Sequence, residues 1–163
     1  NKIIQKLEQI TQNWGGSFRL IESFSNAFHL DDRIYSSVNS QSFIVFDFLL
    51  KELCFEPKTH WVDVIHGMGH MFATDKELQF CPGDECSDFH GWEYAMVKLI
   101  GAPTEIWFKM NREYTVSLDE TPDNYIEFWE LDEINREKYL NQALERAKNL
   151  KILDDDYKPL SIR

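Results

Sequence analysis

Histidine and cysteine are concentrated in one short part of this chain, between His60 and His90. Four of the five histidines and two of the three cysteines lie there. Imidazole and thiolate groups bind transition metals, and imidazole also moves protons near neutral pH. We therefore expect any chemistry of this protein to be located in this segment.

A first group of side chains has the spacing of one helix face. Asp63, His66 and His70 follow one another at intervals of three and four residues, so on a helix they project within about 60° of one another. Two histidines at i and i+4 can both reach one ion. Gly67 and Gly69 flank His66 and His70, and each should weaken the helix by about 1 kcal/mol relative to Ala. That cost indicates that a ligand, a loop or a neighbouring helix approaches the backbone there.

A second pair, His90 and Glu93, is spaced at i and i+3 on the next expected helix. Two helices that each offer a pair of ligands are how metal sites are built in helical bundles. Two kinds of site remain open. In a closed structural zinc site, four ligands are drawn from His66, His70, Cys81, Cys86 and His90.

In the open alternative, the ion keeps a position for water, and Asp63 or Glu93 orients or deprotonates that water. His66, His70 and His90 then hold the ion. Thiolates select zinc, whereas mixed histidine and carboxylate ligands admit iron, manganese or zinc. The sequence therefore predicts a divalent transition metal as the cofactor.

Composition limits the partners of this chain. The 163 residues are 43% hydrophobic and carry a net charge of −11, from 17 basic and 28 acidic residues. A nucleic-acid binder is unexpected, because such proteins neutralise phosphates with Lys and Arg. A small phosphorylated molecule or a basic protein remains as the expected partner. No apolar run approaches the roughly 18 residues of a membrane span, and the odd cysteine count without an N-terminal signal pattern predicts a cytoplasmic protein.

Apolar spacing predicts a single all-α domain over residues 1–163, a bundle of about seven helices. Thr59 is expected to cap the fourth helix, Asp88 the fifth, and Gly101 to end the fifth. The expected helices are Asn1–Trp14, Ser17–Phe28, Phe43–Phe55, His60–Ala73, Phe89–Ile100, Pro103–Met110 and Leu131–Leu150.

The run from Phe43 to Met110 resembles the HD-domain superfamily of metal-dependent phosphohydrolases. VDVIHGMGHMF stands where that family has its HD signature, and FHGWEYAMVKLIGAPTEIWFKM is similar to the later helix pair. The resemblance implies an HD-domain-like fold and hydrolysis of a phosphate ester or nucleotide. It departs from the family at Gly67, where the metal-binding Asp would stand.

Because of that departure, the chain is either a rewired relative that uses Asp63, His70 and Glu93, a scaffold that has lost the chemistry, or no relative. The alternative function is a non-catalytic acidic binding protein, an inhibitor or immunity-type module with at most a structural zinc. This alternative is favoured by the missing Asp and by the net charge of −11.

Overall fold

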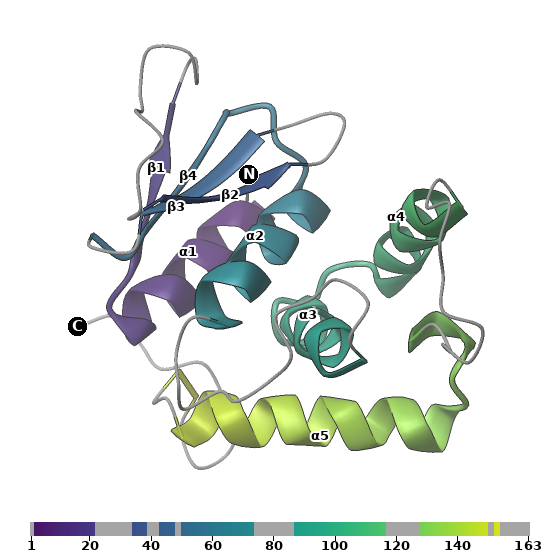
Figure 1. The fold of residues 1–163 in the computed structure, drawn as a ribbon. Helices are drawn as coiled ribbons and strands as arrows, with labels where there is room; N and C mark the ends of the chain where they lie inside the picture. Colours follow the sequence, from purple (N-terminus) through teal and green to yellow (C-terminus); the bar gives the residue numbers. More distant parts are fainter. Residues whose placement is uncertain are drawn as a thin grey trace.

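The structure is a computed structural model that describes residues 2–21, 34–38, 43–47, 50–73, 87–116, 128–149 and 152–153. Within these residues, five α-helices and one short 3-10 helix accompany a four-stranded β-sheet (Figure 1). The predicted all-α, HD-domain-like bundle of about seven helices is therefore wrong, and the fold combines helices with a sheet.

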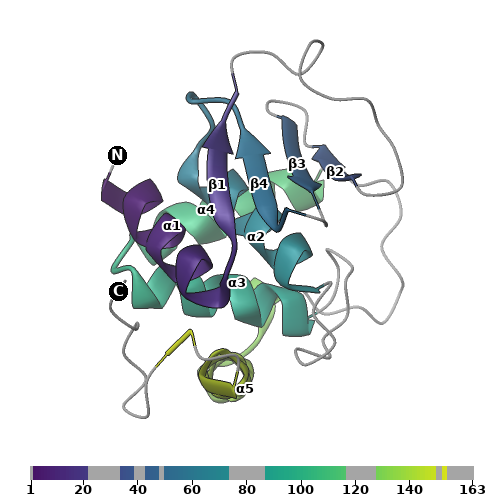
Figure 2. The ribbon, with the colours of Figure 1, turned by 90° about the vertical axis from the view of Figure 1, so that its left-hand side faces the viewer.

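The sheet contains strands from the first third of the chain, in the order β1-β4-β3-β2 (Figure 2). β1 pairs with β4 in parallel, and β3 pairs with both β4 and β2 in antiparallel fashion. Phe18, Leu53 and Phe46 lie opposite one another across three of the strands. The strands are β1 (Ser17–Leu20), β2 (Ile34–Val38), β3 (Phe43–Asp47) and β4 (Glu52–Phe55).

The apolar run Phe43–Phe55, predicted as a buried helix, forms the hairpin of β3 and β4 instead. The chain reverses between the strands, where Lys51 adopts a positive φ of 51° and the Leu50 amide donates to Asp47 Oδ1 at 3.3 Å. Two short and mainly apolar strands close together in the sequence resemble one buried helix in composition, and periodicity does not separate them.

Two further predictions fail in the same part of the chain. The helix predicted from Ser17 is wrong because Ser17–Leu20 is β1. The stretch Asp31–Ser40 has the Asp, Ser and Asn residues typical of a loop, yet it contains β2. Phe18 packs edge-on against Phe55 of the neighbouring strand, so residues distant in sequence decide the conformation of Ser17–Leu20.

The other five predicted helices are present, four of them within two residues of the predicted ends, whereas the helix predicted to end at Met110 continues to Val116. α1 ends at Gly15 and α3 at Gly101, whose φ values of 98° and 67° are ones that glycine adopts easily. The helices are α1 (Lys2–Trp14), α2 (Trp61–Ala73), α3 (Ser87–Leu99), α4 (Thr104–Val116) and α5 (Glu133–Asn149).

Two predicted helix caps are wrong. His60, not Thr59, caps α2: its Nδ1 accepts a hydrogen bond from the Val62 amide at 3.1 Å. α3 begins at Ser87, so Asp88 lies inside its first turn. The cap of α2 was predicted one residue too early, within the usual uncertainty of helix boundaries.

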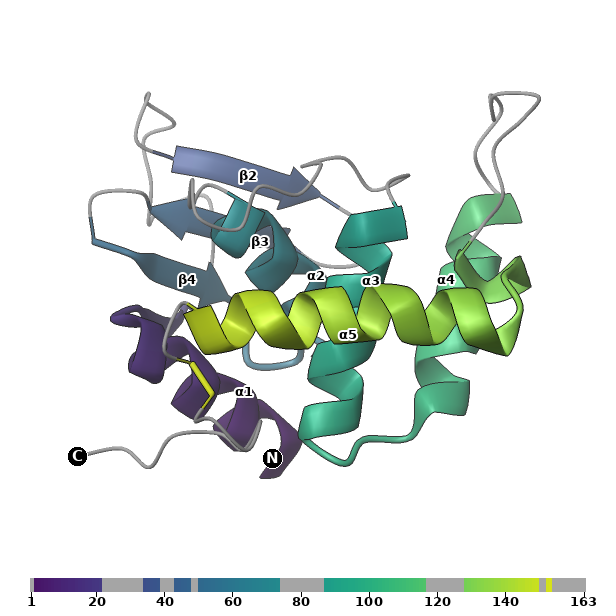
Figure 3. The ribbon, with the colours of Figure 1, turned by 90° about the horizontal axis from the view of Figure 1, so that it is seen from below.

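The helices form successive layers beneath the sheet (Figures 1 and 3). α1 and α2 cover one face of the sheet, α3 packs beside α2, and α5 lies across α3. One hydrophobic core, from Leu7 of α1 to Ala147 of α5, joins these layers. α2 therefore lies in the interior, between the sheet and α3. None of the helices among the described residues is long and apolar enough to cross a membrane.

Candidate functional site

Two imidazole rings meet on the α3-facing side of α2. Nε2 of His66 lies 3.1 Å from Nε2 of His70, and the ring planes are inclined at 82°. The His70 side chain is buried, whereas the His66 side chain is 24% exposed. The pair expected from the i, i+4 spacing is therefore formed, at a place where the interior reaches solvent.

A buried carboxylate from α3 lies against the other side of the His66 ring. His66 Nδ1 is 3.5 Å from Glu93 Oε2. The second oxygen of that carboxylate, Oε1, accepts a hydrogen bond from the indole Nε1 of Trp107 in α4 at 3.3 Å. Glu93 is only 1% exposed, so its surroundings are these protein groups and not bulk water.

The position of Glu93 favours one tautomer of His66. A carboxylate only accepts hydrogen bonds, so its approach to His66 favours the tautomer with the proton on Nδ1. Nε2 of His66 then presents a lone pair toward His70. A neutral imidazole in this tautomer is the form that coordinates a metal ion through Nε2.

The spacing of the two Nε2 atoms fits a shared ion. Two nitrogens bound to one tetrahedral zinc, each about 2.0–2.1 Å from it, are about 3.3 Å apart. The observed 3.1 Å lies within a few tenths of an ångström of that value. Without an ion, the same distance accommodates a hydrogen bond from His70 Nε2 to the His66 lone pair.

The structure does not gather the larger predicted set of ligands. Among the described residues, no group of three or more His, Cys, Asp and Glu side chains is arranged to hold a metal ion. The larger set, with His90, Asp63 and Glu93 as further members, therefore stays a prediction. Cys81 and Cys86 lie outside the described residues, so their role stays a prediction.

His90 lies among aromatic side chains. Its ring packs against Trp129 at 5.3 Å and faces Trp107 at 6.5 Å between centroids. His90 and Glu93 lie on one helix face, as predicted, but Glu93 reaches His66 as well as Trp107. Asp63 is buried on α2, one turn before His66.

Gly67, between the two histidines, occupies the position at which metal-dependent peptidase helices of the H-E-x-x-H type carry their general base. A Cβ atom built on Gly67 would lie 2.6 Å from Ile44 Cγ2 of β3. The sheet therefore leaves no room for a side chain there. The expected close approach to this glycine is confirmed, and the neighbour is a strand.

Sequence reasoning missed Trp107 as a member of this site. It lies 14 residues after Glu93, on the following helix, and no local spacing rule connects the two positions. The contact between Trp107 and Glu93 could be predicted only if the packing of α3 against α4 were already known.

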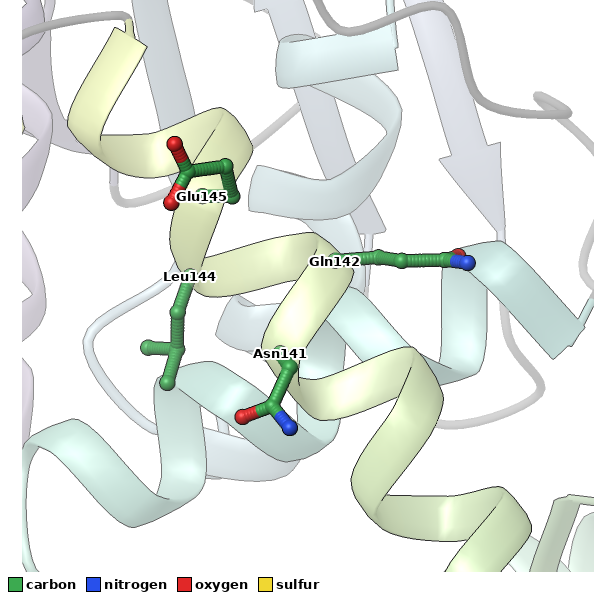
Figure 4. Close-up of a pocket in the computed structure, with 4 residues that line it drawn as sticks. All are labelled: Asn141, Gln142, Leu144 and Glu145. Carbon is green, nitrogen blue, oxygen red and sulfur yellow. The ribbon is translucent and has the colours of Figure 1, made fainter.

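A separate cavity of about 440 Å³ lies along α5. Figure 4 shows that its four described lining residues come from this one helix and project in different directions: Asn141, Gln142, Leu144 and Glu145. They do not converge on a common point, and none of them belongs to the histidine site.

Comparisons with known proteins identify no relative of this chain. No protein-family model matches it, and neither a curated protein nor a solved structure matches it. The resemblance to the HD-domain superfamily consequently stays a prediction from the short motif around His66.

Proposed function

We propose that this protein binds a divalent transition-metal ion through Nε2 of His66 and Nε2 of His70. The observation that carries the proposal is the 3.1 Å separation of the two Nε2 atoms, together with the carboxylate against Nδ1 of His66. Histidine ligands of metals commonly donate their second nitrogen to a carboxylate, which orients the ring.

Two histidine nitrogens do not complete the coordination of the ion, so other ligands must occupy the remaining positions. Water, or thiolates from Cys81 and Cys86 as the sequence predicts, would fill them. Imidazole ligands suit zinc and iron, and thiolates would narrow the choice to zinc. The net charge of −11 supports the proposal, since an acidic surface raises the local concentration of cations. It would also attract a basic protein partner.

The proposal is a binding function and includes no hydrolytic step. Glu93 and Asp63, the two carboxylates predicted to activate water, are both buried. Glu93 already faces His66 and Trp107 with its two oxygens. It is placed to orient a ligand and not to take a proton from a bound water.

The test is zinc affinity, measured by competition with a chromophoric chelator on protein first stripped of metal. We expect the unmodified chain to bind one zinc ion, and His66→Ala and His70→Ala each to weaken binding at least tenfold. His90→Gln serves as the control and should bind as the unmodified chain does. Melting of each variant in excess chelator shows whether it is folded.

Two outcomes would contradict the proposal. The unmodified chain could fail to bind zinc, iron(II) or manganese(II), or His66→Ala could bind with unchanged affinity. Loss of zinc in His90→Gln as large as in His66→Ala would restore the larger ligand set and reject the two-histidine site.

A further inference from the structure

Glu93 connects three helices through one side chain. Its Oε2 faces His66 of α2 at 3.5 Å, and its Oε1 accepts from Trp107 of α4 at 3.3 Å. Each carboxylate oxygen therefore serves a different neighbour. Glu93 thus links the His66–His70 pair of α2 to Trp107 of α4.

A buried carboxylate at this position lowers the stability of the folded state. Glu93 is 1% exposed and Trp107 is fully buried, and a buried charge destabilises a protein unless other groups compensate it. Among the described residues, Glu93 Oε2 makes no hydrogen bond of ordinary geometry. Its 3.5 Å approach to His66 Nδ1 exceeds the usual N–H···O range of about 2.7–3.2 Å. The charge is thus compensated only in part.

A cation on the far side of the His66 ring would complete that compensation. When Nε2 donates its lone pair to a metal ion, the Nδ1–H group becomes more positive and a stronger donor to the carboxylate. Glu93 therefore has the position expected of a carboxylate that accepts a hydrogen bond from a metal-bound imidazole ring.

We propose that Glu93 and Trp107 are positioning residues that set the metal affinity of the His66–His70 pair. This inference rests on the proposed metal binding. Trp107 holds Glu93, and Glu93 holds His66 in the tautomer that presents the Nε2 lone pair. Neither residue touches the ion.

Glu93→Gln separates this role from a purely structural one. The amide oxygen can accept from Trp107, and the amide NH₂ then faces His66 Nδ1, which must become the acceptor. The His66 proton moves to Nε2, the atom that should bind the metal. We expect metal affinity to fall about 10- to 100-fold, while the metal-free protein melts at the same temperature or higher because a buried charge is gone.

Trp107→Phe tests the hydrogen bond from Trp107 to Glu93, because it keeps an aromatic ring and removes the Nε1–H donor. Trp92→Phe is the matched control. Trp92 is the immediate neighbour of Glu93, is equally buried, and packs against Phe72. Both variants lose one buried indole N–H, but only Trp107→Phe removes the hydrogen bond to Glu93.

The experiment combines zinc affinity with the His66 tautomer, read from long-range ¹H–¹⁵N NMR spectra of metal-free protein and assigned with His66→Gln. We expect Nδ1–H in the unmodified chain and in Trp92→Phe, and Nε2–H in Glu93→Gln. Zinc affinity should fall in Glu93→Gln and Trp107→Phe and stay within about twofold in Trp92→Phe.

The possible failures are distinguishable. If the unmodified chain binds no metal but its His66 is Nδ1–H and changes to Nε2–H in Glu93→Gln, the proposed function fails and the positioning by Glu93 stands. If zinc binds, and Glu93→Gln leaves both affinity and tautomer unchanged, the positioning role is rejected. Equal losses in Trp107→Phe and Trp92→Phe would reject the role of Trp107.

Discussion

At the scale of single residues, helix geometry alone pairs His66 with His70, whereas the packing of α3 places His90. The i, i+4 geometry brings His66 and His70 together because it depends only on helix periodicity. The position of His90 depends on which way α3 faces, and there the aromatic rings of Trp107 and Trp129 occupy the space. A ligand pair within one helix was therefore predictable, and convergence between two helices was not.

Cys54 gives a prediction at the same scale. It is fully buried on β4, and burial, opposed in part by a hydrogen bond with Arg19, raises the pKa of its thiol to about 11 from an ordinary value of 9.0. The unfolded chain releases this proton first as the pH rises. The raised pKa therefore contributes stability below about pH 9 that is lost between about pH 9 and 11, up to roughly 3 kcal/mol.

The measurement is urea unfolding between pH 7.5 and 11 for the unmodified chain and for Cys54→Ala. We expect the free energy of unfolding to fall less steeply with pH above pH 9 in Cys54→Ala, whatever its value at pH 7.5. Parallel pH dependences of the two proteins would mean that the folded state does not hold this proton.

At the scale of elements, the helices were predictable and the strands were not. α1, α2 and α5 have local signals: apolar spacing at a helical period, stop glycines and good helix formers. The strands depend on distant partners, since β1 pairs with β4 across more than thirty residues. A segment as short as Ser17–Leu20 carries no detectable period of its own, so its pairing partners in the sheet decide its conformation.

The contact between α2 and β3 yields a second prediction. Alanine favours a helix over glycine by about 1 kcal/mol, yet we expect Gly67→Ala to destabilise the protein by about 1–3 kcal/mol through overpacking. The new Cβ would lie 2.6 Å from Ile44 Cγ2, and Leu53 Cδ1 is 3.4 Å away. The buried strand has little freedom to retreat.

A double-mutant cycle with Ile44→Ala isolates this contact. Ile44→Ala removes the Cγ2 atom that obstructs the new methyl group, so the double variant should be more stable than the sum of the two single effects predicts. Additive effects, measured by chemical unfolding, would show that the loss in Gly67→Ala arises elsewhere.

At the scale of the whole molecule, the layers place the histidine pair on a helix with neighbours on both sides. α2 packs against the sheet through Gly67 and against α3 through the core. Composition and length indicated a folded chain with a sizeable core. They contain no information on layer order, because that order follows from which apolar faces meet, and many arrangements bury similar areas.

This placement predicts that metal binding stabilises the whole fold and not a local segment. α2 cannot unfold without exposing the faces of the sheet and α3, so the binding energy of an ion on His66 and His70 should add to global stability. At a free zinc concentration 100-fold above the dissociation constant, the gain is about 2.7 kcal/mol. For a domain of this size that corresponds to a rise in melting temperature of roughly 5–11 °C. Calorimetry in buffered zinc should show the melting temperature of the unmodified chain rising with the logarithm of zinc concentration, whereas the melting temperature of His66→Ala should stay constant.

If the unmodified chain binds zinc but its melting temperature does not rise, the ligands must bind the ion equally well in the unfolded state, as free thiolates can.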